Sequence, residues 1–150
     1  MEYEIVWRGP IHVVGIALHA SNSRPAEIGA HWQRFWAEGV PGRVANKARE
    51  EVVSLYTGYE GDHSQPYKLV AGCPVTSLDE IPDGMEGHTI PSARYARLVA
   101  KGAMPAAVVG VWQWVWSSDL DRAYTSDFDL YGPAALDPMN AEAEIFVAVK

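Results

Sequence analysis

The sequence contains a single cysteine, Cys73, among its 150 residues, and this scarcity already excludes several kinds of site. One thiol cannot form a disulfide framework or a cysteine-ligated zinc site, so we expect a reducing compartment and predict a cytoplasmic location. We expect Cys73, which precedes Pro74, to be structural rather than nucleophilic. The N-terminus also lacks the basic segment followed by an apolar segment that is typical of a signal peptide.

Long apolar runs and an excess of basic residues are missing as well. The longest apolar stretch, AMPAAVVGVWQWVW at 103–116, is too short to span a bilayer and contains Pro, Gly and Gln. The formal net charge is −7, whereas a protein that binds duplex DNA is expected to have a basic face. We therefore expect neither a membrane nor nucleic acid as a direct partner.

Signature motifs of common enzyme classes are absent too. The sequence has no GxGxxG, GxxxxGK[ST], HExxH or GxSxG motif. Its five histidines show no metal-ligand spacing, and we expect them to face solvent or to cap helices. We assign no catalytic residue, no metal and no cofactor, and the sequence favours binding over catalysis while leaving an enzyme open.

What the sequence does contain is a repeated tryptophan motif, WQxxW, in two stretches that superpose with a shift of 80 residues. The stretches are PAEIGAHWQRFWAEG from position 25 and PAAVVGVWQWVWSSD from position 105. In the first, Ile28, Trp32, Phe35 and Trp36 have the i, i+4, i+7, i+8 spacing of one helical face. Proline suits the first turn of a helix, and Gly39 is a plausible end for the first one. Each stretch is therefore predicted to be an amphipathic helix with two tryptophans near its end.

The segments that flank the two helices repeat in the same order and have the composition of strands. The predicted strands are 11–20, 51–59 and 67–75 around the first helix, and 93–102, 126–133 and 143–150 around the second. Residues 75–91, rich in Pro, Gly and Asp, are predicted to be a connection that can end in a strand. We predict one α+β domain, residues 1–150, made of two β-α-β-β half-domains at about 10–76 and 88–150. A half cannot bury its sheet alone, so two halves are expected to join around a pseudo-twofold axis. They would form an antiparallel sheet under two main helices.

Aromatic residues close to acids are the candidate ligand-binding residues. A single tryptophan on an inner helical face usually fills the core, but Trp and Tyr carry polar groups that need partners. Aromatic rings beside a carboxylate suit a lipophilic cation, since each ring face contributes about 0.5–2 kcal/mol of attraction. The carboxylate stays ionised when hydrogen bonds, such as those from tyrosine hydroxyls, offset its desolvation.

Asp129, in the segment DFDLY, is the favoured carboxylate. On a strand it lies on the same side as Asp127 and Tyr131, because side chains alternate. Alternation alone favours the other interpretation, in which the two acids face solvent while Phe128 and Leu130 pack inside. Two further acids beside Tyr59 serve as reserves and are more typical of solvated turns: Glu60 and Asp62.

The sequence resembles the GyrI-like effector-binding domains, which are fused to bacterial drug-responsive transcription activators of the AraC type and also exist as separate proteins. The stretches that carry the resemblance are VVGIALHASNSRPAEIGAHWQRFW, LYTGYEGDHSQPYKLVAGCPV, TIPSARYARL, DFDLYG and EAEIFVAVK. With no DNA-binding helices fused on, the sequence is most similar to the standalone subgroup, which includes integron-cassette effector-binding proteins.

The resemblance implies a duplicated strand–helix–strand–strand fold with a ligand cleft between the halves for amphipathic, often cationic, small molecules. In the family an acid within an FExY-like segment often meets the cation. Here that segment is FDLY, so the resemblance assigns this role to Asp129 and the tyrosine position to Tyr131. It also implies that Trp112 and Trp116 line the side of the pocket formed by the second helix.

We therefore expect a standalone binding protein for a lipophilic, cationic, drug-like molecule, acting as an effector sensor or a sequestering module, and a monomer or weak homodimer. The expected ligand-binding residues are Asp129, Tyr131, Trp112, Trp116, Tyr56, Tyr59, Trp36 and Phe128. Two alternatives stay open. A hydrolase of reactive cyclopropane-type toxins on the same fold needs a second pocket carboxylate with a different pKa. A gyrase-inhibitor-like interaction module needs an exposed acidic or apolar patch.

Overall fold

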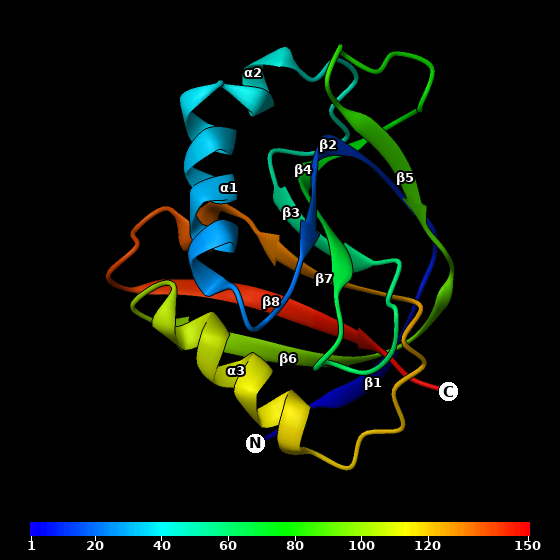
Figure 1. The fold of residues 1–150 in the computed structure, drawn as a ribbon, viewed down its shortest axis with the longest axis vertical. Coiled ribbons are helices and arrows are strands. Elements are labelled where there is room, and N and C mark those ends of the chain that lie inside the picture. The colour runs from blue at the N-terminus through cyan, green and yellow to red at the C-terminus, as the bar shows by residue number, and fades with distance from the viewer.

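Eight strands and three α-helices make up the structure, a computed structural model that describes residues 1–150 (Figure 1). Along the chain they are β1 (Glu4–Arg8), β2 (Ile11–Ala20), α1 (Pro25–Ala37), α2 (Val40–Arg43), β3 (Val52–Thr57), β4 (Tyr67–Val75), β5 (Glu86–Ile90), β6 (Ala93–Gly102), α3 (Ala106–Ser117), β7 (Ser126–Tyr131), a 3₁₀ turn (Pro133–Ala135) and β8 (Ala141–Ala148). The strands predicted at 11–20, 67–75 and 93–102 coincide with β2, β4 and β6. The other three predicted strands lie within about two residues of β3, β7 and β8.

All eight strands belong to one antiparallel sheet with the order β1-β6-β8-β7-β3-β4-β2-β5. This order is symmetrical about the central β3–β7 pair, with β2-α1-β3-β4 on one side and β6-α3-β7-β8 on the other. The predicted α+β fold is therefore confirmed. Strand β1, which the sequence analysis did not predict, pairs with β6, and β5 pairs with β2. Strand β1 thus precedes the first half along the chain but extends the sheet beside β6 of the second half. Strand β5 precedes β6 but extends the sheet beside β2 of the first half.

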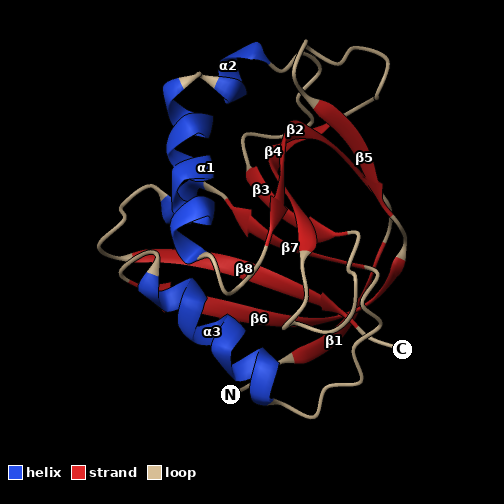
Figure 2. Ribbon diagram, viewed as in Figure 1, coloured by secondary structure: helices blue, strands red, loops and turns tan.

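The two faces of the sheet are buried in different ways, one under helices and the other by the curl of the sheet itself. One face carries α1 and α3, which lie on the same side of the sheet (Figure 2). The other face is covered by no helix, and its core cluster is made of strand residues from both halves. Within it Phe128 stacks on Phe146, with ring centroids 4.7 Å apart. The sheet curls around this helix-free face, so that both of its sides are buried.

Helix α1 is rotated relative to the predicted buried face. Its buried side chains are His31 and Phe35, whereas Trp36, which was predicted on that face, is 61 % exposed. His31 Nε2 donates to the Ile16 carbonyl oxygen at 2.9 Å, so this histidine is a buried anchor rather than the expected solvent-facing or capping residue. The buried residues of α3 are Val108, Val111, Trp112 and Val115. None of the helices combines the length and apolar character needed to cross a membrane.

Candidate ligand-binding site

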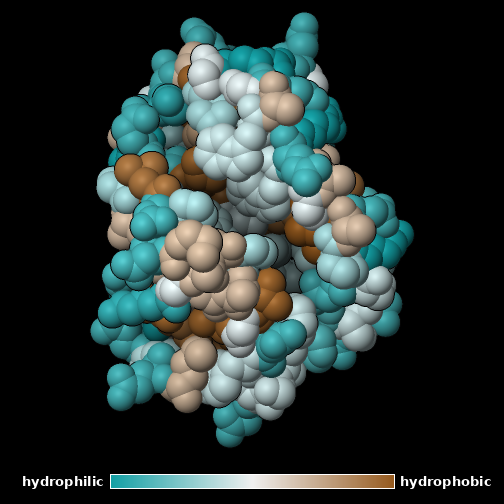
Figure 3. Space-filling model, turned by 90° about the vertical axis from the view of Figure 1, so that its left-hand side faces the viewer, coloured by the Kyte–Doolittle hydropathy of each residue, from teal (hydrophilic) through white to brown (hydrophobic).

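A cavity of about 950 Å³ lies between α1 and α3 on the helix-bearing face of the sheet. Its size is within the range of small-molecule pockets, and its lining is mostly apolar and aromatic. Figure 3, which views the side of the molecule on which α1 lies, shows a central hollow with apolar side chains at its rim. The aromatic lining comes from both helices, from the strands beneath them and from the loop after β3: Trp32, Trp36, Tyr56, Tyr59, Tyr67, Trp112, Trp116 and Tyr131.

Asp129 is held directly behind this lining, in β7, with no solvent exposure. Its Oδ2 accepts hydrogen bonds from the Tyr56 hydroxyl at 2.7 Å and the Tyr131 hydroxyl at 3.1 Å. Its Oδ1 accepts one from Trp112 Nε1 at 3.1 Å. Burial raises the pKa of Asp129 to about 7, although these three hydrogen bonds oppose the shift. The carboxylate is therefore poised between its neutral and ionised forms near neutral pH.

The donors around Asp129 come from matching positions of the two halves. In the β3–β7 register Ser54 faces Asp129, and Tyr56 and Tyr131 each lie two residues further along their strands. Tyr56 packs against Trp112 with ring centroids 5.0 Å apart, and Tyr131 packs against Trp32 at 6.2 Å. These two tryptophans are the first of each WQxxW motif. The repeated motif therefore builds the same tyrosine–tryptophan pair twice, on either side of one buried carboxylate.

Asp127 is the neighbouring carboxylate on the same side of β7, and it has a cationic partner. Arg122 Nη2 donates to its Oδ2 at 2.7 Å, and the Ala148 amide donates to its Oδ1 at 2.7 Å. The Tyr59 hydroxyl also donates to Oδ2. Burial raises the pKa of Asp127 above its usual range, while Arg122 and these hydrogen bonds oppose that shift. Arg122 is thus neutralised locally, and Asp129 remains the buried carboxylate without a cation beside it.

The structure brings most of the predicted ligand-binding residues together. Those that line the cavity are Tyr131, Trp112, Trp116, Tyr56, Tyr59 and Trp36. Asp129 and Asp127 are fully buried, so the interpretation that placed them in solvent is wrong. Phe128 is not at the cavity, because strand alternation turns it into the core cluster of the helix-free face, and we remove it from the site.

The reserve acids do not reach the cavity. Glu60 is exposed, and its Oε2 is within hydrogen-bonding distance of His19 Nε2 at 2.7 Å. Asp62 is an exposed residue that accepts a hydrogen bond from the Ser64 amide. Burial and hydrogen bonding at Asp129 therefore set it apart from the acids on the loop.

Several lining residues were not among the predicted set. One of them is Trp32, although the repeat itself pairs it with Trp112. His63 lies on the long connection after β3, and its ring stacks on Trp116 with centroids 5.8 Å apart. Residues 132–138 close one end of the cavity, and their sequence, GPAALDP, carries no pattern that indicates a binding role.

The fold is that of the effector-binding domains of the GyrI-like type. Residues 4–149 match the family Cass2, the integron-associated effector binding proteins, so the chain belongs to this family. The resemblance noted in the sequence is thereby confirmed.

Individual relatives agree with this assignment. An integron cassette protein from the mobile metagenome of Vibrio cholerae is 27% identical, with a TM-score of 0.80 over 99% of this chain and 95% of that one. The structure of SAV2435 bound to tetraphenylphosphonium has a TM-score of 0.80 at 24% identity, over 100% of this chain and 94% of the other. YobU of Bacillus subtilis (strain 168), named as a candidate transcriptional regulator protein, is 25% identical over 144 residues, or 91% of this chain and 90% of YobU.

Proposed function

We propose that the cavity binds an amphipathic organic cation with aromatic or other apolar groups, and that Asp129 supplies the counter-charge. The observation that carries this proposal is the buried Asp129 carboxylate, which has no cationic partner and lies directly behind a wall of aromatic rings. Tetraphenylphosphonium, the ligand in the SAV2435 structure, has this chemistry. The name of YobU supports a regulatory role, in which the protein senses its ligand or sequesters it.

The two tyrosine hydroxyls connect the carboxylate to the ligand. Because Tyr56 and Tyr131 donate their hydroxyl protons to Asp129, their oxygen lone pairs remain free to act as acceptors. Hydrogen bonds in such a chain polarise one another, which carries negative charge from the carboxylate toward the cavity. Each favourably placed ring adds about 0.5–2 kcal/mol of cation–π attraction. The ligand thus needs no direct contact with Asp129.

Binding without chemistry fits this geometry better than hydrolysis. A hydrolytic carboxylate has to reach a water molecule or the leaving group. Asp129 and Asp127 have no exposed surface, and protein donors occupy their oxygens. Glu50, the acid that lines the cavity, has an 87% exposed side chain and lies 3.7 Å from Lys47 Nζ. Neither arrangement provides the pair of pocket carboxylates that a hydrolase on this fold would need.

The test is a titration of tryptophan fluorescence, because four tryptophans line the cavity: Trp32, Trp36, Trp112 and Trp116. Tetraphenylphosphonium should quench the emission saturably and reversibly at micromolar concentration. Triphenylphosphine oxide, which is neutral and of similar shape, should bind at least about tenfold more weakly, or roughly 1.4 kcal/mol. Mass spectrometry should recover the cation unchanged. Equal affinity for the two compounds would overturn the cationic part of the proposal.

A further inference from the structure

We propose that a second pocket, separate from the ligand cavity, is a binding site for an oxyanion of the phosphate type. This pocket has a volume of about 350 Å³ and shares no lining residue with the larger cavity. It lies where β1 passes into β2, at Arg8–Ile11, and is closed by Ala48 and Arg49 on the other side. Its lining residues differ from those of the proposed cation site, and its charged side chains are arginines rather than a carboxylate.

Arg8 forms one side of this pocket. Its guanidinium carbon lies 4.7 Å from the ring centre of Phe146 and 5.9 Å from that of Phe128, at the edge of the helix-free core. Arg8 takes part in none of the ion pairs or side-chain hydrogen bonds of the structure. Stacking holds a guanidinium group in place but leaves its N–H donors without acceptors. Arg8 is therefore a half-buried, positioned cation that still lacks an anionic partner.

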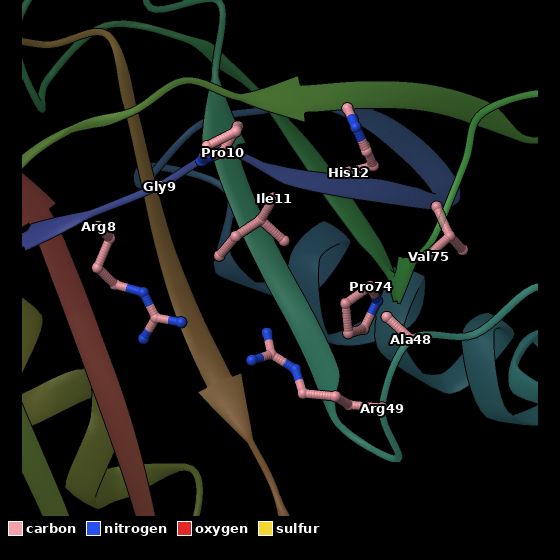
Figure 4. A pocket seen from close by; sticks show the side chains of 9 residues that line it. All are labelled: Arg8, Gly9, Pro10, Ile11, His12, Ala48, Arg49, Pro74 and Val75. Carbon is pink, nitrogen blue, oxygen red and sulfur yellow. The ribbon is translucent and has the colours of Figure 1, made fainter.

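Arg49 forms the other side. It lies on the segment before β3, where its Nε is 2.8 Å from Glu51 Oε1, and its side chain is 46% exposed. Figure 4 shows the guanidinium groups of Arg8 and Arg49 directed toward one another across the pocket. None of the side chains that line the pocket contains an oxygen atom. The pocket therefore presents two converging cations, and no carboxylate is among the side chains that line it.

This arrangement selects the charge and the shape of the ligand. Two like charges repel, and an anion between them removes the repulsion. Guanidinium groups bind carboxylate or phosphate through paired hydrogen bonds, and a tetrahedral phosphate has oxygens for donors on two opposite sides. A phosphate group, free or carried by a small molecule, thus suits the pocket better than a planar carboxylate. A long polyanion such as nucleic acid would meet a chain whose net charge is −7, which favours a small ligand.

The experiment measures binding of inorganic phosphate and of phenyl phosphate by ³¹P NMR and calorimetry, at constant ionic strength set with chloride. We expect saturable binding at millimolar or lower concentration, weakened at least about fivefold in Arg49→Gln and in Arg8→Gln. Arg34→Gln is the matched control, because Arg34 is also a surface arginine paired with a glutamate, and it should bind as the wild type does. If phosphate and its ester both bind, the pocket takes the free ion. If only the ester binds, it takes a phosphorylated small molecule.

Two results would overturn the inference. The first is that neither compound binds saturably up to roughly 10 mM, which corresponds to less than about 3 kcal/mol of binding free energy. The second is that Arg49→Gln binds as tightly as the wild type. Arg49 is exposed, so its replacement leaves the core intact and keeps the test valid even if Arg8→Gln loses stability. Tetraphenylphosphonium is not used, so this outcome is independent of the cation proposal.

Discussion

Replacing Asp129 with asparagine is expected to stabilise the protein by about 2–4 kcal/mol at pH 8. The folded-state pKa of Asp129 is raised to about 7 by burial, from an ordinary value of 3.8. Between these two values the folded protein holds a proton that the unfolded chain has lost. Stability of the wild type therefore falls as the pH rises from about 4 to about 7, and above about 8 the loss is complete. Asparagine stays neutral throughout and avoids this loss.

Denaturant unfolding at pH 4 and pH 8 measures the effect as a difference between the variant and the wild type. The gain should be large at pH 8 and small at pH 4. Asp127→Asn is the matched comparison, because it removes the neighbouring carboxylate from a buried pair with Arg122. That change should destabilise the protein by roughly 3–5 kcal/mol, since it leaves a buried cation without its partner. A stability loss in Asp129→Asn at pH 8 would show that the Asp129 carboxylate is not strained by burial.

The same Asp129→Asn variant is expected to lose about 1–3 kcal/mol of affinity for tetraphenylphosphonium, which is about 5- to 150-fold in Kd. Asparagine keeps the size of the side chain but carries no charge. Its amide oxygen can accept from Trp112 Nε1, whereas its NH2 group can only donate, so the hydroxyls of Tyr56 and Tyr131 have to turn and accept from it. One substitution should therefore raise stability and lower cation affinity, as is typical of a functional site that is costly to bury.

Fluorescence titration at pH 8 measures this loss, and triphenylphosphine oxide should bind the variant and the wild type alike. Glu60→Gln removes an exposed acid outside the cavity and should leave the affinity for the cation unchanged. Equal losses in Asp129→Asn and Glu60→Gln would mean that the effect comes from the overall charge of the protein. In that case the assignment of the counter-charge to Asp129 is wrong.

Local patterns in the sequence were sufficient to predict most of the fold. Strands such as β2, β4 and β6 are long and rich in β-branched or alternating residues, so their limits could be predicted to the residue. Strand β1 was missed because it is a short edge strand whose Ile5 and Trp7 are exposed. Edge strands bury little, so their sequences carry a weak alternation signal.

The site was less predictable because alternation does not say what covers each face of a sheet. It correctly placed Asp127, Asp129 and Tyr131 on one side of β7 and Phe128 on the other. It could not show that both sides are buried, since this depends on the curl of the sheet and on α3. Trp36 was predicted to line the cavity, but its exposure was not predicted, because helical spacing does not separate a core-facing residue from one at an open cavity.

Sequence patterns could not predict contacts between residues that are far apart along the chain. The ion pair between Arg122 and Asp127 joins residues on a loop and a strand that no motif connects. Arg8 and Arg49 are 41 positions apart and meet only because β1 crosses to the edge of the other half. Such pairs follow from topology, which is established by the packing of the two halves as a whole.

The most direct test of the central claim is whether binding of tetraphenylphosphonium at pH 7 releases a proton from Asp129. Calorimetry in buffers with different heats of ionisation measures this release. A cation near Asp129 favours its ionised form, so a group with a pKa of about 7 should release about half a proton. Affinity should rise from pH 6 to pH 8. The release should vanish in Asp129→Asn and persist in His63→Gln, which replaces a histidine that also lines the cavity. Cation binding without proton release, and with an affinity independent of pH, would contradict the account.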